Sequence, residues 1–267
     1  MEKKVINLNI ACGDHITLNK NWINLDYEAN NKIVIKCDLI NNIPFEKNTV
    51  SNIYLSHFIE HISLDKVDYF LNNCFNILET HGKIRIVTPD FYEMSSSFVK
   101  AYENKNYDIA ELIKIEILDQ LVRSKEGGRL RLIIKKYVKN NDEEMLNIIK
   151  NRFGKDLITN NKNNIAKKNY FKIIRNKLIK SYIFFVLKFL PNSFKNQNIS
   201  FTKIGENHKW LWDFDDLKKR LEINGFKNVL KKKFNESDIK DFPYDLDVKD
   251  NLPRKGIQSM YIEAEKK

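Results

Sequence analysis

Four short apolar runs between residues 5 and 61 each end in a small, acidic or polar residue, and this pattern constrains the fold more than any other feature. The runs are VINLNIACGD, WINLDY, VIKCDL and NIYLSHFIEH. Buried parallel strands have this appearance, because both faces of their sheet are covered and the residues after each carboxyl end line a crevice. The sequence therefore predicts an α/β domain with a ligand site along one edge of a parallel sheet.

Two acidic residues, Asp26 and Asp38, lie at the ends of successive strands in this pattern. Carboxylates at such positions accept hydrogen bonds from ribose hydroxyls and from an exocyclic amine, so the edge suits a nucleoside. The alternative is that both are ordinary surface acids at the starts of loops. The residues predicted to share the edge are Cys12, Gly13, Asp26, Asp38, Ser56 and His57.

The segment resembles the cofactor half of the class I S-adenosylmethionine-dependent methyltransferases. The resemblance covers about the first 90 residues well and residues 206–267 more loosely. It implies S-adenosylmethionine as cofactor and S-adenosylhomocysteine as product. The matching residues are Ala11, Cys12 and Gly13 under the methionine moiety, Asp26 at the ribose, Asp38 and Leu39 at the adenine, and Ser56 and His57 beside the sulfonium.

Two features depart from the family pattern. The family's first turn usually has two or three glycines, and here it has only Gly13. Residues 14–21 are too short for a full crossover helix, so we expect a turn between the first two strands. The Cys-Gly-Asp turn, the following Trp-Ile-Asn-x-Asp and a late His-x-Trp resemble a branch of the family encoded with bacterial surface-polysaccharide genes.

The remaining chain completes a doubly wound, Rossmann-like sheet. We expect seven mostly parallel strands, with the last one antiparallel between the fifth and the sixth, as the resemblance implies. Strand-helix-strand alternation favours right-handed parallel crossovers. The expected elements are a helix capped by Ser63 and running to Leu78, a break at His81-Gly82, a strand KIRIVTP, a helix from Asp213 or Asp215 to Asn224, and strands at 226–234 and 259–264.

The predicted domain organisation is a core, residues 1–90 and 206–267, interrupted by a helical insertion at 91–205 that forms a lid on the acceptor site. Residues 157–205 hold no acidic residue and ten Lys or Arg, in a chain of net charge +11. This block could bind a phosphate-bearing substrate, lie on an anionic membrane surface, contact RNA or simply be solvated. Nucleic acid is the least favoured partner, because no RNA-binding signature is present.

The cysteine spacing and the length of the apolar stretches indicate in which cellular compartment the protein works. The three cysteines lie far apart and form no CxxC pair, which favours a reducing environment. No signal peptide precedes the first strand-like run, and the longest apolar stretch, residues 181–190, is about half of the ~20 residues that a spanning helix needs. We therefore expect a cytoplasmic protein, with peripheral contact at the inner membrane surface as an option.

Three histidines are candidates for chemistry. His57 and His61 form an H-x-x-E-H sequence, which on a helix would be a zinc motif. A strand-like run leads directly into it, however, so we expect no metal. His208 precedes the late helix and in the family layout faces the transferred methyl group. His208 and His57 are thus the candidate general bases.

The predicted function is methyl transfer from S-adenosylmethionine to an oxygen acceptor, a sugar hydroxyl or a phosphoryl-linked group, in surface-polysaccharide biosynthesis. The basic insertion and the resemblance together favour a small-molecule or glycan substrate, with a phosphorylated or nucleotide-linked one as an option. Two alternatives stay open: a degenerate cofactor-binding module that docks a glycan-assembly complex or membrane, and a zinc hydrolase through His57 and His61. The sequence does not predict the oligomeric state.

Overall fold

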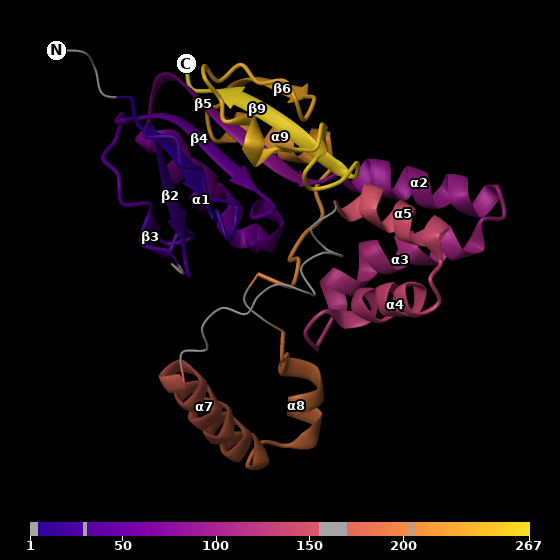
Figure 1. Cartoon of the computed structure of the whole chain (residues 1–267). Coiled ribbons are helices and arrows are strands. Elements are labelled where there is room, and N and C mark those ends of the chain that lie inside the picture. Colours follow the sequence, from indigo (N-terminus) through magenta and orange to yellow (C-terminus); the bar gives the residue numbers. More distant parts are fainter. Residues whose placement is uncertain (1–4, 29–30, 155–169, 203–204) are drawn as a thin grey trace.

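The computed structural model describes residues 5–28, 31–154, 170–202 and 205–267. Its main sheet has seven strands in the order β3-β2-β1-β4-β5-β9-β6. The strands are β1 (Asn7–Ile10), β2 (Trp22–Asp26), β3 (Val34–Lys36), β4 (Val50–Ser56), β5 (Leu78–Pro89), β6 (Lys227–Lys232) and β9 (Ser259–Glu265). Figure 1 shows this sheet at one end of the molecule and a group of helices beside it.

The sheet confirms the predicted fold class. The pairs β1–β2, β2–β3, β1–β4 and β4–β5 are parallel. Strand β9 is antiparallel to both β5 and β6 and lies between them. The strand order reverses between β1 and β4, which is the kind of switch point where open α/β sheets bind ligands.

The helices follow the predicted plan with small shifts of boundary. The core helices are α1 (Leu64–Ile77) and α9 (Phe214–Ile223). Asp213 caps α9 by accepting a hydrogen bond from the Asp216 amide at 2.9 Å. Helix α1 ends at Ile77 and β5 begins at Leu78, before the break predicted at His81-Gly82; at these two residues His81 has φ of +66° and the register of β5 against β4 shifts.

One face of the sheet packs against α1 and α9. Alternate residues of each strand point into this core, which explains the period of two in the strand sequences. Phe70 and Leu71 of α1 and Leu217 of α9 are fully buried there. The apolar positions of both helices recur at three and four residues, so each presents one continuous stripe to the sheet.

The opposite face is covered by an irregular segment instead of helices. Residues 234–246, which include the short 3-10 helix η2 (Tyr244–Leu246), pack Ile239, Phe242 and Leu246 against this face. A two-stranded hairpin, β7 (Val248–Lys249) and β8 (Leu252–Pro253), follows. The late part of the chain therefore does the covering that crossover helices do in a fully wound fold.

A buried charge cluster fixes that segment. Arg85 of β5 is fully buried and donates from Nε to Asp247 at 2.8 Å and from Nη1 to Glu263 at 2.7 Å. The Tyr54 hydroxyl donates to the same Asp247 at 2.6 Å. Burial and the Asp247 charge hold the pKa of Tyr54 well above its usual value. Each buried polar group thus has a partner that offsets its desolvation.

The first crossover has no helix, as predicted from its length. Residues 14–21 form turns at both ends and irregular chain between them, and two buried asparagines hold the segment in place. Asn24 accepts from the Thr17 amide at 3.0 Å and donates to the Thr17 carbonyl at 2.9 Å. Asn9 donates to the His15 carbonyl and to the Asn24 side chain, both at 2.9 Å. These amides satisfy backbone groups that a helix would have satisfied itself.

The segment between β5 and α9 is helical. Its helices are α2 (Phe91–Glu103), α3 (Tyr107–Val122), α4 (Gly128–Lys139), α5 (Glu143–Phe153), α7 (Tyr170–Lys188) and α8 (Asn192–Asn198). Helices α2 to α5 form a bundle beside the sheet, and α7 and α8 stand apart from both (Figure 1). Among the described residues, no helix has the length and apolar character needed to cross a bilayer.

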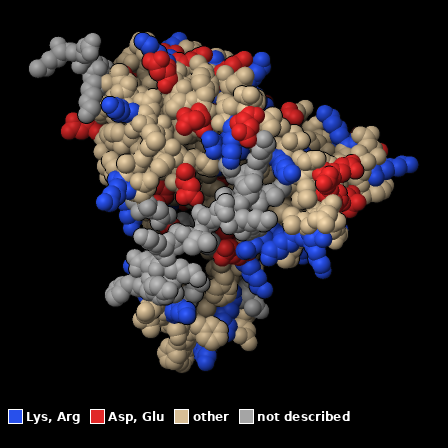
Figure 2. Space-filling view, in the orientation of Figure 1, with Lys and Arg blue, Asp and Glu red and all other residues tan. Residues whose placement is uncertain are grey.

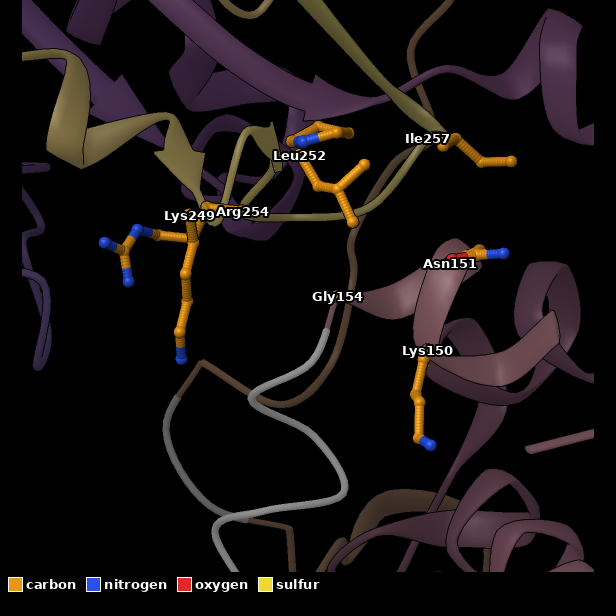
Figure 3. A pocket seen from close by; sticks show the side chains of 8 residues that line it. Lys150, Asn151, Gly154, Lys249, Leu252, Arg254 and Ile257 are labelled. Atoms are coloured by element: carbon orange, nitrogen blue, oxygen red, sulfur yellow. The ribbon is translucent and has the colours of Figure 1, made fainter. Parts of the chain in front are cut away.

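The end of α5 approaches the chain before β9 very closely. The Ile257 amide donates to the Asn151 carbonyl at 3.0 Å. Lys150 and Asn151 of α5 line a cavity of about 20 Å³ together with Leu252 and Ile257, and Figure 3 shows Asn151 opposite Ile257. Gly256 lies at the contact with φ of +84°, and a Cβ there would overlap the carbonyl oxygen of Arg152. The helical bundle is therefore anchored to the core at a point where only glycine fits.

We expect Gly256→Ala to lower the free energy of unfolding by about 2–3 kcal/mol, from left-handed strain plus the overlap with Arg152. Gly205→Ala is the matched control, because Gly205 has a similar φ of +77° but open space around its Cβ position. The control should cost only about 1 kcal/mol. Urea unfolding followed by circular dichroism measures both, and equal losses would show that the close approach contributes nothing.

Candidate functional site

The carboxyl ends of the first strands open on a cavity of about 580 Å³. This volume is typical of small-molecule sites. Six of the eight predicted cofactor-binding residues line it. They are Ala11, Gly13, Asp26, Asp38, Leu39 and His57. The structure therefore brings these side chains together at one edge of the sheet.

The turn after β1 is held by Asp26. Gly13, with φ of +51°, donates its amide to Asp26 Oδ2 at 2.8 Å. Ala11 also has a left-handed backbone, with φ of +53°. Asp26 Oδ1 accepts from the Glu28 amide at 2.8 Å. Each carboxylate oxygen has a second lone pair, so Asp26 can still accept hydrogen bonds from a ligand in the cavity.

The wall after β3 combines an acid with apolar side chains. Asp38 is exposed, and its Oδ2 accepts from the Asn41 side chain at 2.7 Å. Leu39 is buried at its side. Ile40 and Phe58 also line the cavity. A flat aromatic ligand such as adenine would meet apolar surface on its faces and polar atoms at its edge here.

Cys12 and Ser56 line a second, smaller cavity of about 250 Å³ that adjoins the first and shares Ala11, Gly13, Asp14 and His57 with it. Burial, followed by the nearby Asp26 charge, raises the pKa of Cys12 to about 12. The thiol therefore stays protonated at neutral pH and is a poor nucleophile. Ser56 Oγ is buried without a hydrogen-bond partner among the described residues.

His57 lies at the centre of the site. It follows β4 with a left-handed φ of +51°, and its amide donates to the Val87 carbonyl at 2.8 Å. Its Nε2 is 3.0 Å from Ser259 Oγ, and its Nδ1 is 3.3 Å from Glu60 Oε1. Burial and the positive charge of Lys255 hold the pKa of His57 well below its usual value. The imidazole is therefore neutral near pH 7 and able to accept a proton.

A third cavity, of about 300 Å³, joins the core to the helical bundle. Arg152 of α5 lines it and donates from Nε to Glu116 of α3 at 2.9 Å. Gln258 is buried in the wall, and its Oε1 finds no hydrogen-bond partner within the described parts of the chain. Arg254 and Lys255 also line the space. Basic groups outnumber acids around this cavity.

Sequence reasoning did not identify this third cavity. Arg152 and Gln258 are about a hundred residues apart and meet only through the contact between α5 and the chain before β9. The one local signal was the basic Arg254-Lys255 pair within LPRKG, directly ahead of the last strand. His15, next to the first turn, lines the second and third cavities and was also missed.

The other two histidines pair with each other. His61 donates from Nδ1 to the Asn207 carbonyl at 2.9 Å, and its ring lies edge-on to His208 with centroids 4.9 Å apart. His208 is 5% exposed and does not line the three cavities above. The Glu60 carbonyl accepts from the Lys209 and Trp210 amides, which fixes the His208 loop against the end of β4.

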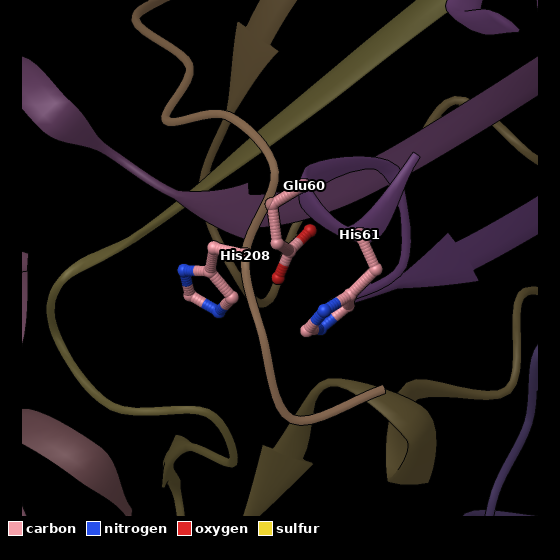
Figure 4. A group of neighbouring side chains, drawn as sticks. All are labelled: Glu60, His61 and His208. Atoms are coloured by element: carbon pink, nitrogen blue, oxygen red, sulfur yellow. The ribbon is translucent and has the colours of Figure 1, made fainter. Parts of the chain in front are cut away.

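Figure 4 shows the Glu60 carboxylate between the rings of His61 and His208. These three residues could each offer a metal-ligand atom within 4.8 Å of the others. The Glu60 carboxylate, however, already accepts from Thr88 at 3.1 Å and faces His57. His57 and His61 also do not share a helix face, because the 3-10 helix η1 (Ile59–His61) begins after His57. The prediction of no metal stays a prediction.

His208 makes stability depend on pH. Burial, followed by His61 and Arg123, lowers the pKa of His208 from 6.5 to about 3. Between pH 6.5 and 3, His208 is therefore protonated in the unfolded chain but neutral in the folded one. The free energy of unfolding falls as pH falls through this range. We expect the contribution of His208 to lower the free energy of unfolding by about 2–3 kcal/mol between pH 6.5 and 4.5, at about 1.4 kcal/mol per pH unit.

Urea unfolding of the parent and of His208→Gln at several pH values measures this effect. The variant should show a shallower fall of stability below pH 6.5, whatever its stability at pH 7. If the two curves run parallel between pH 6.5 and 4.5, His208 is not held neutral by the fold.

Comparison with known proteins gives structural similarity only. No family model and no curated protein matches the chain. A methyltransferase of Archaeoglobus fulgidus aligns at 14% identity over 99% of this chain and 87% of its own, with a TM-score of 0.41. A possible histamine N-methyltransferase of Thermotoga maritima aligns at 12% identity over 98% and 82%, with a TM-score of 0.38.

A third structure, the methyltransferase bound to the Trm112 activator of Haloferax volcanii, aligns at 8% identity over 99% of this chain and 84% of its own, with a TM-score of 0.39. All three are described as methyltransferases, and the first two are described as S-adenosylmethionine-dependent. With identities this low and TM-scores below 0.5, the similarities carry no conclusion about the activity of this chain.

Proposed function

We propose that the protein transfers a methyl group from S-adenosylmethionine to an oxygen atom of an anionic acceptor. The observation that carries the proposal is a chain of three adjoining cavities that all contain His57. The first suits a nucleoside, the third suits an anion, and the second connects them. Such an arrangement holds two substrates end to end, with the reaction centre between them.

The residues of the first two cavities fit the cofactor. Asp26 would accept from the ribose hydroxyls, and Asp38 with Leu39 would hold the adenine. The turn from Ala11 to Gly13 would lie under the methionine moiety, with Ser56 and its unpaired hydroxyl beside it. When bound, the cofactor supplies an electrophilic methyl group on a sulfonium, and the protein has only to bind, orient and exclude water.

His57 is the better placed of the two candidate bases. Its Nε2 lies 3.0 Å from Ser259 Oγ on the side of the third cavity, and in the tautomer protonated on Nδ1 it could accept a proton there. His208 is buried away from the cavities, against His61. We therefore assign proton removal from a hydroxyl acceptor to His57. A phosphoryl oxygen, already anionic, would need no base.

Charge favours an anionic acceptor. Arg152, Arg254 and Lys255 line the third cavity against a single carboxylate, that of Glu116. Lysine and arginine suit phosphoryl groups, although the Nε and Nη2 groups of Arg152 and Arg254 already donate to Glu116 and to the Asp245 carbonyl. A nucleotide-linked sugar or a phosphorylated glycan meets this requirement and agrees with the resemblance to enzymes of surface-polysaccharide synthesis. We place the reaction in the cytoplasm, where such activated sugars are made.

The insertion at 91–205 would act as the acceptor lid. Helices α3 and α5 contribute Glu116, Gln120 and Arg152 to the third cavity. Residues from the core, Lys255 and Gln258 among them, form the opposite wall. A substrate between these walls would be shielded from water on both sides, which strengthens its contacts with charged groups.

Methyl-labelled cofactor and a panel of acceptors test the proposal. The panel pairs nucleotide sugars and sugar phosphates with the corresponding neutral sugars. We expect label in an ether or ester oxygen of the anionic members, and strongly reduced transfer with Lys255→Gln. Label that appears only on nitrogen or carbon, or equally on the neutral sugars, would contradict the assignment of the acceptor.

A cofactor-binding module without catalysis is the second candidate. The single glycine of the first turn, whose amide is already taken by Asp26, favours it. The same assay separates the two functions, because a module would bind S-adenosylhomocysteine without transferring label to any acceptor of the panel. A zinc hydrolase is less favoured, since His57 and His61 contact different groups.

A further inference from the structure

Helix α7 carries a stripe of large apolar side chains that the rest of the described chain leaves exposed. The stripe recurs at three and four residues, so its members share one face of the helix. Each of them is between 58% and 75% exposed. They are Ile174, Leu178, Tyr182, Phe185 and Phe189, the last lying just beyond the helix end.

Further large apolar side chains are exposed on the other sides of α7 and on α8. Ile179, Ile183 and Phe184 are each at least 45% exposed, and Phe194 of α8 is 48% exposed. Water-soluble surfaces rarely gather so many large apolar side chains on one element without a partner. The stripe is independent of the three cavities, which none of these residues line.

The charge on the same segment has one sign. Residues 157–205 contain ten Lys or Arg and no Asp or Glu. Arg175, Lys177 and Lys188 are exposed on α7 itself. In Figure 2 the part of the molecule formed by α7 and α8 shows blue and tan surface without red. The partner of this surface is therefore apolar and anionic at once.

We propose that α7 lies in the plane of an anionic lipid bilayer, with the stripe from Ile174 to Phe189 sunk among the acyl chains and the neighbouring Lys and Arg at the headgroups. The stripe of this 19-residue helix contains Tyr182 and Phe185 and has the exposed basic residues Arg175, Lys177 and Lys188 beside it, a combination found in interfacial anchors. Each basic residue near an anionic surface adds to the attraction, and salt screens it.

A second copy of the chain is the competing occupant. Two α7 helices could bury their stripes against each other. This would bring two segments of high positive charge together without an acid between them, and like charges oppose such contact. An anionic bilayer neutralises the charge and covers the apolar face in one step, so it fits the segment better.

Flotation of the full-length protein with lipid vesicles tests the proposal. The vesicles are phosphatidylcholine alone or phosphatidylcholine with phosphatidylglycerol, at low and high salt. The variants are Phe185→Glu on the stripe and Leu18→Glu as the matched control, since Leu18 is 82% exposed on the core, in the crossover between β1 and β2. Thermal unfolding confirms that each variant is folded, and light scattering gives its oligomeric state.

We expect the parent to float with vesicles that contain phosphatidylglycerol and to dissociate from them at high salt. It should not bind vesicles of phosphatidylcholine alone. Phe185→Glu should reduce the partition by about tenfold or more, and Leu18→Glu should leave it unchanged. Failure of the parent to float, equal flotation with neutral vesicles, or equal effects of the two variants would overturn the proposal. A parent dimer that Phe185→Glu converts to a monomer would assign the stripe to self-association instead.

Discussion

Replacing Asp247 with alanine is expected to lower the free energy of unfolding by about 3–5 kcal/mol. Asp247 is buried and accepts hydrogen bonds from Arg85 at 2.8 Å and from the Tyr54 hydroxyl at 2.6 Å. The substitution would leave Tyr54 without an acceptor and Arg85 with Glu263 as its one remaining acidic partner in this cluster. Both groups are far from water, so their desolvation is no longer offset.

Asp68→Ala is the matched control for this experiment. Asp68 also pairs with an arginine, Arg220, at 2.7 Å, but both side chains are partly exposed. Water solvates them when the pair is broken, so the expected cost is about 1 kcal/mol or less. Urea unfolding at pH 7 measures both variants. If Asp247→Ala costs no more than Asp68→Ala, the Arg85 cluster does not anchor the segment that covers the sheet.

His57→Gln is expected to lower kcat for a hydroxyl acceptor by about 10²–10⁴-fold while leaving the affinity for S-adenosylhomocysteine within a few-fold of the parent. Glutamine can still form hydrogen bonds at this position but cannot take the proton. The neutral state of His57 at pH 7, which follows from its lowered pKa, is the state that a base requires. Steady-state kinetics with the acceptor found by labelling gives kcat.

His81→Gln is the control, because His81 pairs with Glu265 on the surface at the opposite edge of the sheet. It should keep the kcat of the parent. If His57→Gln also keeps it, the acceptor oxygen loses no proton in the slow step. If His57→Gln instead weakens cofactor binding in proportion to the loss of kcat, the role of His57 is to shape the cofactor site.

The parallel strands and the cofactor edge could be predicted because their signals are local. Each strand is a short run rich in apolar residues, with a small, acidic or polar residue at its end or shortly after it. Asp26 and Asp38 therefore had to fall at the same edge once the sheet was parallel. The absence of a helix at 14–21 followed from length alone.

The covering segment at 234–246 could not be predicted, because its signals are not periodic. Its contacts depend on Arg85, a charged residue in the middle of an apolar strand, and on Asp247, more than 150 residues later. The sequence shows no feature that links the two. In the same way, Arg152 of α5 reaches the third cavity through Gly256, which in the sequence is an ordinary loop glycine.

The positions of the histidine rings could not be predicted from the sequence either. Sequence spacing set His57 beside His61 and put His208 in a separate loop. The left-handed backbone at His57 turns its ring toward Glu60 and Ser259, while His61 meets His208. His57 and His61 both line the first cavity, but only His57 also lines the second and third. The left-handed backbone that places its ring there is not visible in the residue types.

Calorimetric titration with S-adenosylhomocysteine, on the parent and on Asp26→Ala, tests the central claim most directly. The account predicts micromolar binding by the parent and a loss of about 1–3 kcal/mol in the variant, roughly 5- to 150-fold in affinity, because the ribose loses its acceptor. Asp68→Ala should bind like the parent. Absence of binding by the parent, or equal binding by Asp26→Ala, would contradict the assignment of the cofactor site to this edge of the sheet.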